Sequence, residues 1–149
     1  DHYGDGIDAD CDGLDCETDT LGSLRFAACG PANLNWFDAL DACSALGDDL
    51  ASLRSPSEDT LASDLLDILG AAEGQTAWGW VGGSDFAVEG SWAWADGASF
   101  SYENWQITAP GGGSSENCID LLSTSAGGDW NDDDCLSGFS NVYYICQKR

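Results

Sequence analysis

Basic side chains are scarce in this sequence of 149 residues. Four Lys and Arg stand against 27 Asp and Glu, and the formal net charge is −23. A surface with this charge repels the phosphate backbone of nucleic acids and the headgroups of anionic lipids. We therefore expect no nucleic-acid partner. The charge suits a salty or calcium-bearing medium, or self-repulsion that keeps a secreted protein soluble.

Long apolar runs and catalytic histidines are also missing. No segment approaches 18 consecutive apolar residues, so no membrane insertion is expected. No leader of charged, apolar and small residues stands at Asp1, and we read the chain as already processed. The single histidine, His2, lies in the acidic start of the chain, so the remaining sequence cannot assemble a Ser-His-Asp or Cys-His pair. The sequence predicts a protein that is not an enzyme.

The seven cysteines include no CxxC pair, which disfavours zinc binding and thiol redox chemistry. So many cysteines in a short chain are typical of an oxidising compartment, and we expect a secreted, extracellular protein with disulfide bonds. Six of them can pair, and the seventh is either free or joined to another chain. An apolar fraction of 43%, with seven tryptophans, is enough for a globular core.

The first 20 residues differ from the rest of the chain. They contain eight acidic residues, no Lys or Arg and little apolar surface, and therefore cannot fold alone without a ligand. From Leu21 onwards the composition becomes mixed and includes aromatic residues. We predict an acidic calcium-binding segment over residues 1–20 and one folded domain over residues 21–149.

The stretch DADCDGLDCETD, residues 8–19, has the spacing of a calcium loop. Its neighbouring carboxylates repel each other by about 0.7 kcal/mol at roughly 6 Å in water. In the pattern D-x-D-x-D-G-x5-[DE], three carboxylates, a glycine turn and a closing acid surround one Ca²⁺. The residues that match are Asp8, Asp10, Asp12, Gly13 and Asp19. We predict structural calcium binding with a dissociation constant of about 0.1 to 1 mM, and the alternative is a solvated acidic tail.

A second, overlapping register of the same pattern begins at Asp1 and continues through Asp5 and Gly6 to Asp12, but Tyr3 occupies one of its ligand positions. No amphipathic helices flank these loops, so an EF-hand proper is not expected. The segment resembles the acidic calcium repeats of thrombospondin type 3 and of bacterial secreted proteins.

Apolar residues at helical spacing predict two helices. The first covers residues 35–47, with Asn35 as its N-cap and Gly47 at its end. The second begins at Ser55 or Ser57 and ends at Gly70.

Strand candidates follow the helices, apart from one short strand between them. They are residues 48–53, 76–83, 90–97, 116–123 and 141–148. Because helices precede strands and no βαβ alternation is visible, we predict an α+β fold with an antiparallel sheet. A long irregular loop over about residues 95–117 is expected to hold a site.

Several short motifs, in order, carry a resemblance to a known family. They are NW..A...C at residues 35–43, WVGG at 80–83, W.W.DG at 92–97, Y.NW at 102–105, ENC at 116–118, WND...C at 130–135 and YYIC at 143–146. In this order and spacing the chain resembles the C-type lectin-like domain family over about residues 24–149. The resemblance implies a disulfide-braced α+β fold with two helices, antiparallel sheets and a long loop region.

The resemblance also implies two disulfide bonds, Cys43–Cys146 and Cys118–Cys135. The chain-entropy model assigns about 4.7 kcal/mol to a bond that closes ~100 residues and about 3 kcal/mol to one that closes ~15. Cys11, Cys16 and Cys29 remain. We expect Cys11 to pair with Cys16, and the alternative is a Cys16–Cys29 pair.

In sugar-binding members of this family, a calcium ion is held by a triplet in the long loop, by a Glu before the ENC cysteine and by the Asn and Asp of WND. The last three ligands match Glu116, Asn131 and Asp132. The triplet is replaced by Ala109-Pro110-Gly111, which has no side-chain oxygen. The hypotheses are a retained Ca²⁺ that binds sugar, an ion held differently through Asp133 and Asp134, or a packing role for the WND motif.

Most of the seven tryptophans fall on core positions of the family, so we expect them to pack in the core rather than to stack on carbohydrate. Trp105, beside the loop, is the candidate ligand-binding aromatic residue.

The sequence is compatible with two functions. The first is a secreted, calcium-dependent binding module for a glycan or protein ligand. The second is a structural subunit of an extracellular assembly or filament, in which self-association uses the calcium segment or an unpaired cysteine.

Overall fold

The computed structural model describes residues 15–149. The strands are β1 (Asp15–Leu21), β2 (Leu24–Leu34), β3 (Asp49–Leu50), β4 (Trp78–Ser84), β5 (Ala93–Trp94), β6 (Cys118–Leu122), β7 (Trp130–Asp133) and β8 (Phe139–Lys148). The helices are α1 (Trp36–Ala45) and α2 (Pro56–Ala72). The predicted calcium ligands Asp1, Asp5, Asp8, Asp10 and Asp12, and the cysteine Cys11, lie outside the described residues.

The two helices confirm the sequence prediction at their starts. Asn35 caps α1 with a complete capping box, in which its side chain accepts from the backbone of Asp38 and its own backbone donates to the Asp38 carboxylate. Ser55 caps α2, with proline at the first helical position. The second helix continues past the predicted end at Gly70 to Ala72. Glycine at position 70 leaves room for the returning chain, since a Cβ there would lie 2.6 Å from the carbonyl oxygen of Gln75.

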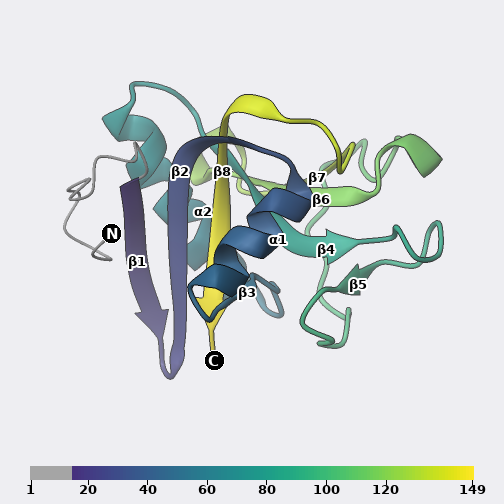
Figure 1. The fold of residues 1–149 in the computed structure, drawn as a ribbon, viewed down its shortest axis with the longest axis horizontal. Coiled ribbons are helices and arrows are strands. Elements are labelled where there is room, and N and C mark those ends of the chain that lie inside the picture. Colours follow the sequence, from purple (N-terminus) through teal and green to yellow (C-terminus); the bar gives the residue numbers. More distant parts are fainter. Residues whose placement is uncertain (1–14) are drawn as a thin grey trace.

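The strands form one mixed sheet in the order β1-β2-β8-β4-β6-β7, with β3 beside β8 and β5 beside β4. The α+β class is confirmed, but two details of the prediction are wrong. The pair β4–β8 is parallel, because the last strand enters the middle of the sheet between β2 and β4. The first two strands also precede α1, so the helices do not come first (Figure 1).

The helices cover opposite faces of the sheet (Figure 1). Side chains alternate between faces along each strand, so Val81 of β4 and Ile119 of β6 pack with helix α2, whereas Trp80 and Cys118 pack with helix α1. Two apolar cores result, one on each side. Within residues 15–149, no helix is both long and apolar enough to cross a membrane.

Three disulfide bonds brace this sheet. Cys43–Cys146 joins α1 to β8, and Cys118–Cys135 joins β6 to the segment after β7, as the resemblance implied. Cys16 pairs with Cys29.

The expected Cys11–Cys16 bond is therefore wrong, because Cys16 and Cys29 face each other on the antiparallel strands β1 and β2. The predicted boundary between residues 20 and 21 also falls inside β1, since the whole of this strand pairs with β2.

Candidate functional site

A buried carboxylate fixes the start of the long loop. Asp59 of α2 is 2% exposed, and its oxygens accept hydrogen bonds from Trp130 Nε1 (3.1 Å), Tyr102 Oη (2.8 Å) and Asn104 Nδ2 (2.7 Å). These donors come from β7 and from the loop between β5 and β6. Burial raises the pKa of Asp59 although the three hydrogen bonds oppose the shift. Asp59 therefore ties the loop and β7 to helix α2.

The predicted aromatic ligand residue Trp105 belongs to this packed part of the loop. Its ring lies 4.8 Å from the Trp92 ring and 5.6 Å from the Trp130 ring, centroid to centroid, and it packs against the core on the α2 side. Trp36, Trp80, Trp94 and Trp130 are buried, as expected for core positions. Trp92, the neighbour of Trp105, lines the cleft that is described next.

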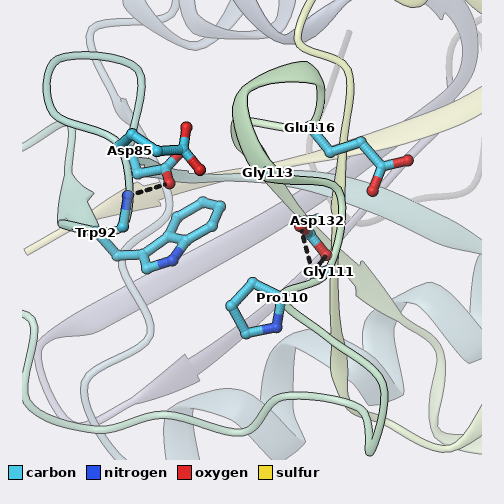
Figure 2. A pocket seen from close by; sticks show the side chains of 9 residues that line it. Asp85, Trp92, Pro110, Gly111, Gly113, Glu116 and Asp132 are labelled. Carbon is cyan, nitrogen blue, oxygen red and sulfur yellow. Dashed lines mark hydrogen bonds between the residues drawn. The ribbon is translucent and has the colours of Figure 1, made fainter.

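The far part of the loop borders a cleft of about 320 Å³, named here the loop cleft (Figure 2). It is lined by Asp85, Glu89, Gly90, Trp92, Pro110, Gly111, Gly113, Glu116 and Asp132. The walls are the loop after β4, the segment from Pro110 to Glu116 and the end of β7. Four carboxylates and one indole ring face this cleft, and none of its lining residues is basic.

Backbone amides hold one of these carboxylates. Asp132 is 3% exposed, and its oxygens accept hydrogen bonds from the backbone N–H groups of Gly111 (2.8 and 3.0 Å) and Gly112 (3.0 Å). A Cβ on Gly111 would lie 2.8 Å from the Thr108 carbonyl oxygen, so the tight turn requires glycine. The segment that replaces the family's calcium triplet therefore neutralises Asp132 with N–H donors.

The structure does not bring the three predicted lectin-type calcium ligands together. Glu116 and Asp132 line the loop cleft, but Asn131 lines a different cleft together with Asp120. The reason is the strand period: neighbouring residues of β7 point to opposite faces of the sheet. A calcium ion takes six to eight oxygens, and Asp132 already accepts three N–H bonds, so this donor set does not fit the ion.

Two carboxylates of the loop cleft were missed by sequence reasoning. Asp85 and Glu89 follow β4 in a loop without a recognisable ligand pattern, and the signal that could have found them is their position directly after the WVGG motif. Asp85 is 2% exposed; its Oδ2 accepts from the Gly90 backbone (2.8 Å), and its buried Oδ1 has no hydrogen-bond partner within residues 15–149. An unpaired buried oxygen of this kind is costly and fits a cation.

Glu116, which lines the same cleft, lies close to other carboxylates that repel its charge. Burial and the nearby charges of Asp132, Asp133 and Asp134 raise the pKa of Glu116. Within the described part of the chain, however, no three Asp, Glu, His or Cys side chains converge on one point as a metal-binding group. The carboxylates line the cleft without forming a closed cage.

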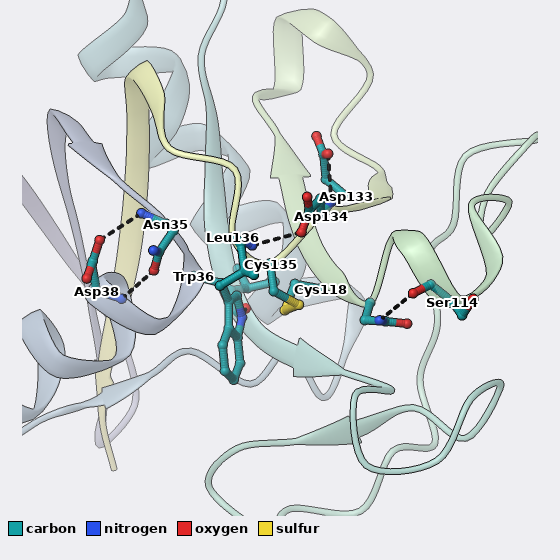
Figure 3. The surroundings of a disulfide bond; sticks show 11 residues. Asn35, Trp36, Asp38, Ser114, Cys118, Asp133, Asp134, Cys135 and Leu136 are labelled. Atoms are coloured by element: carbon teal, nitrogen blue, oxygen red, sulfur yellow. Dashed lines mark hydrogen bonds between the residues drawn. A yellow bond between two sulfur atoms is a disulfide. The ribbon is translucent and has the colours of Figure 1, made fainter.

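The disulfide Cys118–Cys135 holds the segment after β7 in place (Figure 3). The Trp36 backbone N–H donates to the Cys135 carbonyl at 3.1 Å, and the Trp36 ring nitrogen donates to the Val81 carbonyl at 2.8 Å. The start of α1 is thereby attached both to this segment and to β4. Of the proposed alternative ion ligands, Asp133 is the last residue of β7 and Asp134 lies between β7 and Cys135 (Figure 3).

The closing residue of the predicted acidic loop, Asp19, lies in strand β1. It pairs with Phe26 across the sheet, and its exposed carboxylate accepts from the backbone of Thr20 at 2.7 Å. The other ligands of that loop precede the described residues, so the acidic calcium loop stays a prediction.

All four basic residues of the chain lie away from the loop cleft, paired with carboxylates. Arg25 contacts Asp48 at 2.5 Å and Lys148 approaches the same residue at 3.9 Å. Arg54 pairs with Asp96 at 2.8 Å, and Arg149 pairs with Glu58 at 2.9 Å. Charge is therefore segregated: cations compensate acids near the chain terminus, and the cleft side keeps its negative charge.

The chain is a disulfide-braced α+β domain, and its long loop folds against the sheet to form a cleft. This arrangement is typical of a binding module that uses its loops to contact a ligand. The model of the Lectin C-type domain matches residues 32–148, and the chain belongs to this family. No curated protein sequence matches it significantly.

Similar solved structures differ in what they are described to do. The cow CD23 carbohydrate-recognition domain, solved in the presence of a GlcNAc2Man3 oligosaccharide, is 28% identical, with 88% of this chain and 92% of that chain covered and a TM-score of 0.69. Herring type II antifreeze protein is 29% identical (88% and 94%, TM-score 0.73). A calcium-independent type II antifreeze protein is 25% identical (88% and 90%, TM-score 0.71). The fold alone therefore does not select the ligand.

The anchoring role of Asp59 gives a stability prediction. Asp59→Ala leaves the buried Trp130 Nε1, and the Tyr102 and Asn104 donors, without their acceptor. We expect the free energy of unfolding to fall by about 3 kcal/mol, measured by denaturant titration at pH 7. Asp41 is exposed on α1, so Asp41→Ala is the control and should change the free energy of unfolding by less than about 0.5 kcal/mol. Equal effects of the two variants would show that the anchor is unimportant.

The buried carboxyl of Asp120 predicts a pH dependence. Burial, and next the charge of Asp133, raise the pKa of Asp120 to about 8, from an ordinary value of 3.8. Since the folded state holds this proton more tightly, its contribution is complete below pH 4 and is lost as the pH rises towards 8, by about 1.4 kcal/mol per pH unit. In Asp120→Asn, the fall in unfolding free energy between pH 5 and pH 8 should be smaller by several kcal/mol than in the wild type. An unchanged slope would contradict the assignment.

Proposed function

We propose that this domain is an extracellular binding module that recognises a glycan in the loop cleft and depends on calcium. The observation that carries the proposal is the lining of the cleft: Asp85, Glu89, Glu116 and Asp132 surround it together with the Trp92 ring. Carboxylates accept hydrogen bonds from sugar hydroxyls, and an indole ring packs against the apolar face of a sugar. The cow CD23 domain, studied with an oligosaccharide, supports this ligand class.

Calcium fits the loop cleft better than it fits the predicted set of Glu116, Asn131 and Asp132. Asp85 offers a buried oxygen without a hydrogen-bond partner among the described residues, and Glu89 and Glu116 line the same space. The ion would neutralise these carboxylates and hold the loop after β4 against the long loop. Because the carboxylates do not converge on one point, we expect weak binding, with a dissociation constant of about 1 mM.

The N-terminal acidic loop and secretion belong to the same proposal. Asp8, Asp10, Asp12 and Asp19 would hold a structural ion, and the register that begins at Asp1 and Asp5 would hold another. Three disulfides support an oxidising, extracellular location.

Calorimetry with CaCl2 tests the two kinds of ion site separately. Asp85→Asn combined with Glu89→Gln should remove the weak site of the loop cleft, and Asp10→Ala should remove the site of the acidic loop. The exposed Asp41 and Asp49 provide the charge-matched controls, Asp41→Asn for the single variant and Asp41→Asn with Asp49→Asn for the double variant.

The wild type, but not the double variant, should be retained on a mannan matrix in calcium and released by a chelator. If the double variant binds as many ions with the same affinity and is retained equally, the cleft is not the site.

A second candidate function is that of a structural subunit in an extracellular assembly. It is favoured by the cysteine count, since the three disulfides account for six of the seven cysteines and leave Cys11. Such a subunit would associate with copies of itself through this cysteine or through the calcium segment.

Native mass measured under non-reducing conditions, with and without a chelator, decides between the two functions. An assembly protein should give multimers that disappear in Cys11→Ser or in the chelator. A binding module should stay monomeric as wild type and as Cys11→Ser, both with and without the chelator, which would exclude the assembly function.

A further inference from the structure

The face of the sheet opposite the loop cleft carries a second cleft. It has a volume of about 380 Å³, within the range of small-molecule sites, and is named here the strand cleft. Its lining residues are Trp78, Gln106, Asp120, Leu122, Asn131 and Asp133. Asn131 and Asp133 of β7 face it, whereas Asp132 between them faces the loop cleft, so the two clefts share one strand but no lining residue.

Rigid strands position every group of this cleft except Gln106. Trp78 of β4 is opposite Leu122 of β6, and Asp120 of β6 is opposite Asn131 of β7. Gln106 is fixed through its backbone N–H, which donates to the Trp130 carbonyl at 2.8 Å. The cleft therefore has an apolar wall at one end and carboxyl and amide groups at the other.

Asp120 is the group that lacks a proper partner. It is 3% exposed, in a strand that is buried on both faces. Within residues 15–149, the one hydrogen bond to its carboxylate is a long contact of 3.4 Å from Asn131 Nδ2 to Oδ2, and no donor reaches Oδ1. A buried carboxylate normally has strong donors or a countercharge.

Residues 15–149 offer no countercharge to Asp120. All four basic side chains are paired with Asp48, Glu58 and Asp96, and none lines the strand cleft. We propose that the strand cleft binds an organic ammonium group on a short aliphatic stem, such as the end of a lysine side chain, with the ammonium between Asp120 and Asp133 and the stem against Trp78 and Leu122.

The composition of the cleft selects this ligand class over two others. Calcium requires six to eight oxygens, and the strand cleft has two carboxylates that do not form a metal-binding group with a third acid among the described residues. A neutral sugar would leave the buried acidic pair without a countercharge. An ammonium ion supplies that charge and three N–H donors, which match two carboxylates and an amide oxygen.

Titration with n-butylammonium chloride at pH 9, where the Asp120 carboxyl is ionised and the amine is still protonated, tests the proposal. The chemical shift of the Trp78 indole N–H, followed in ¹H–¹⁵N spectra, should change during the titration and reach a plateau. The curve should fit one bound molecule per chain with a dissociation constant of about 1 mM. Asp120→Asn and Asp133→Asn should each weaken binding about tenfold. Asp85→Asn, which changes only the loop cleft, should leave the affinity unchanged and so keeps this test independent of the calcium-dependent glycan site.

Three matched probes give the contrary outcomes. If n-butanol shifts the Trp78 signal with the same affinity, the cleft is merely apolar. If methyl α-mannoside or CaCl2 saturates the signal while n-butylammonium does not, the ligand is a sugar or a metal ion. Each of these results would overturn the proposal, as would full-strength butylammonium binding by both carboxamide variants.

Discussion

The buried carboxylate of Asp59 is the interaction on which the arrangement of the loop side depends. Helix α2 is far in sequence from β7 and from the long loop, and between β5 and β6 the loop contains only one short 3₁₀ turn. The Asp59 side chain of α2 accepts hydrogen bonds from both of them: from the indole of the fully buried Trp130 in β7, and from Tyr102 and Asn104 in the loop. Because buried donors are costly without an acceptor, the loop has one strongly preferred position on the sheet.

Around this fixed point, charge is distributed unevenly. The four cations stabilise buried or partly buried acids at the end of the molecule where β3, α2 and the last residues of β8 meet. The side with β6, β7 and the long loop must hold its carboxylates by other means. Backbone amides donate to Asp132 and Asp85, whereas burial and neighbouring acids disfavour the charge and raise the pKa of Glu116, Asp120 and Asp133. Each of these is a place where a cation or a hydrogen-bonding ligand lowers the free energy.

Much of the fold follows from local signals in the sequence. Helix caps at Asn35 and Ser55, and the strands in each of the predicted ranges, depend on neighbouring residues, and the family motifs imply the Cys43–Cys146 and Cys118–Cys135 bonds. Strand β2 was missed, because its Ala-rich sequence with Gly30 and Pro31 has low β-propensity and is stabilised by its partners β1 and β8. The parallel β4–β8 pair depends on the order of the whole sheet, which no local pattern contains.

The candidate site was less predictable, because it depends on which face each side chain takes. Motif matching places Glu116, Asn131 and Asp132 in one ligand set, whereas the strand alternation of β7 divides them between two clefts. Asp85, in turn, becomes a site residue only because the loop after β4 folds over the cleft. Proximity of this kind is set by tertiary packing and is not visible in spacing along the chain.

The replacement of the family's calcium triplet has a physical consequence beyond the loss of two oxygens. Where a triplet side chain would bind an ion that also binds Asp132, Gly111 and Gly112 present N–H groups directly to that carboxylate. The turn therefore neutralises Asp132 without a metal, and the remaining charge of the cleft lies with Asp85, Glu89 and Glu116 on its other walls. An ion in the loop cleft would therefore act on those three residues, which differs from the ion geometry that the WND motif implies.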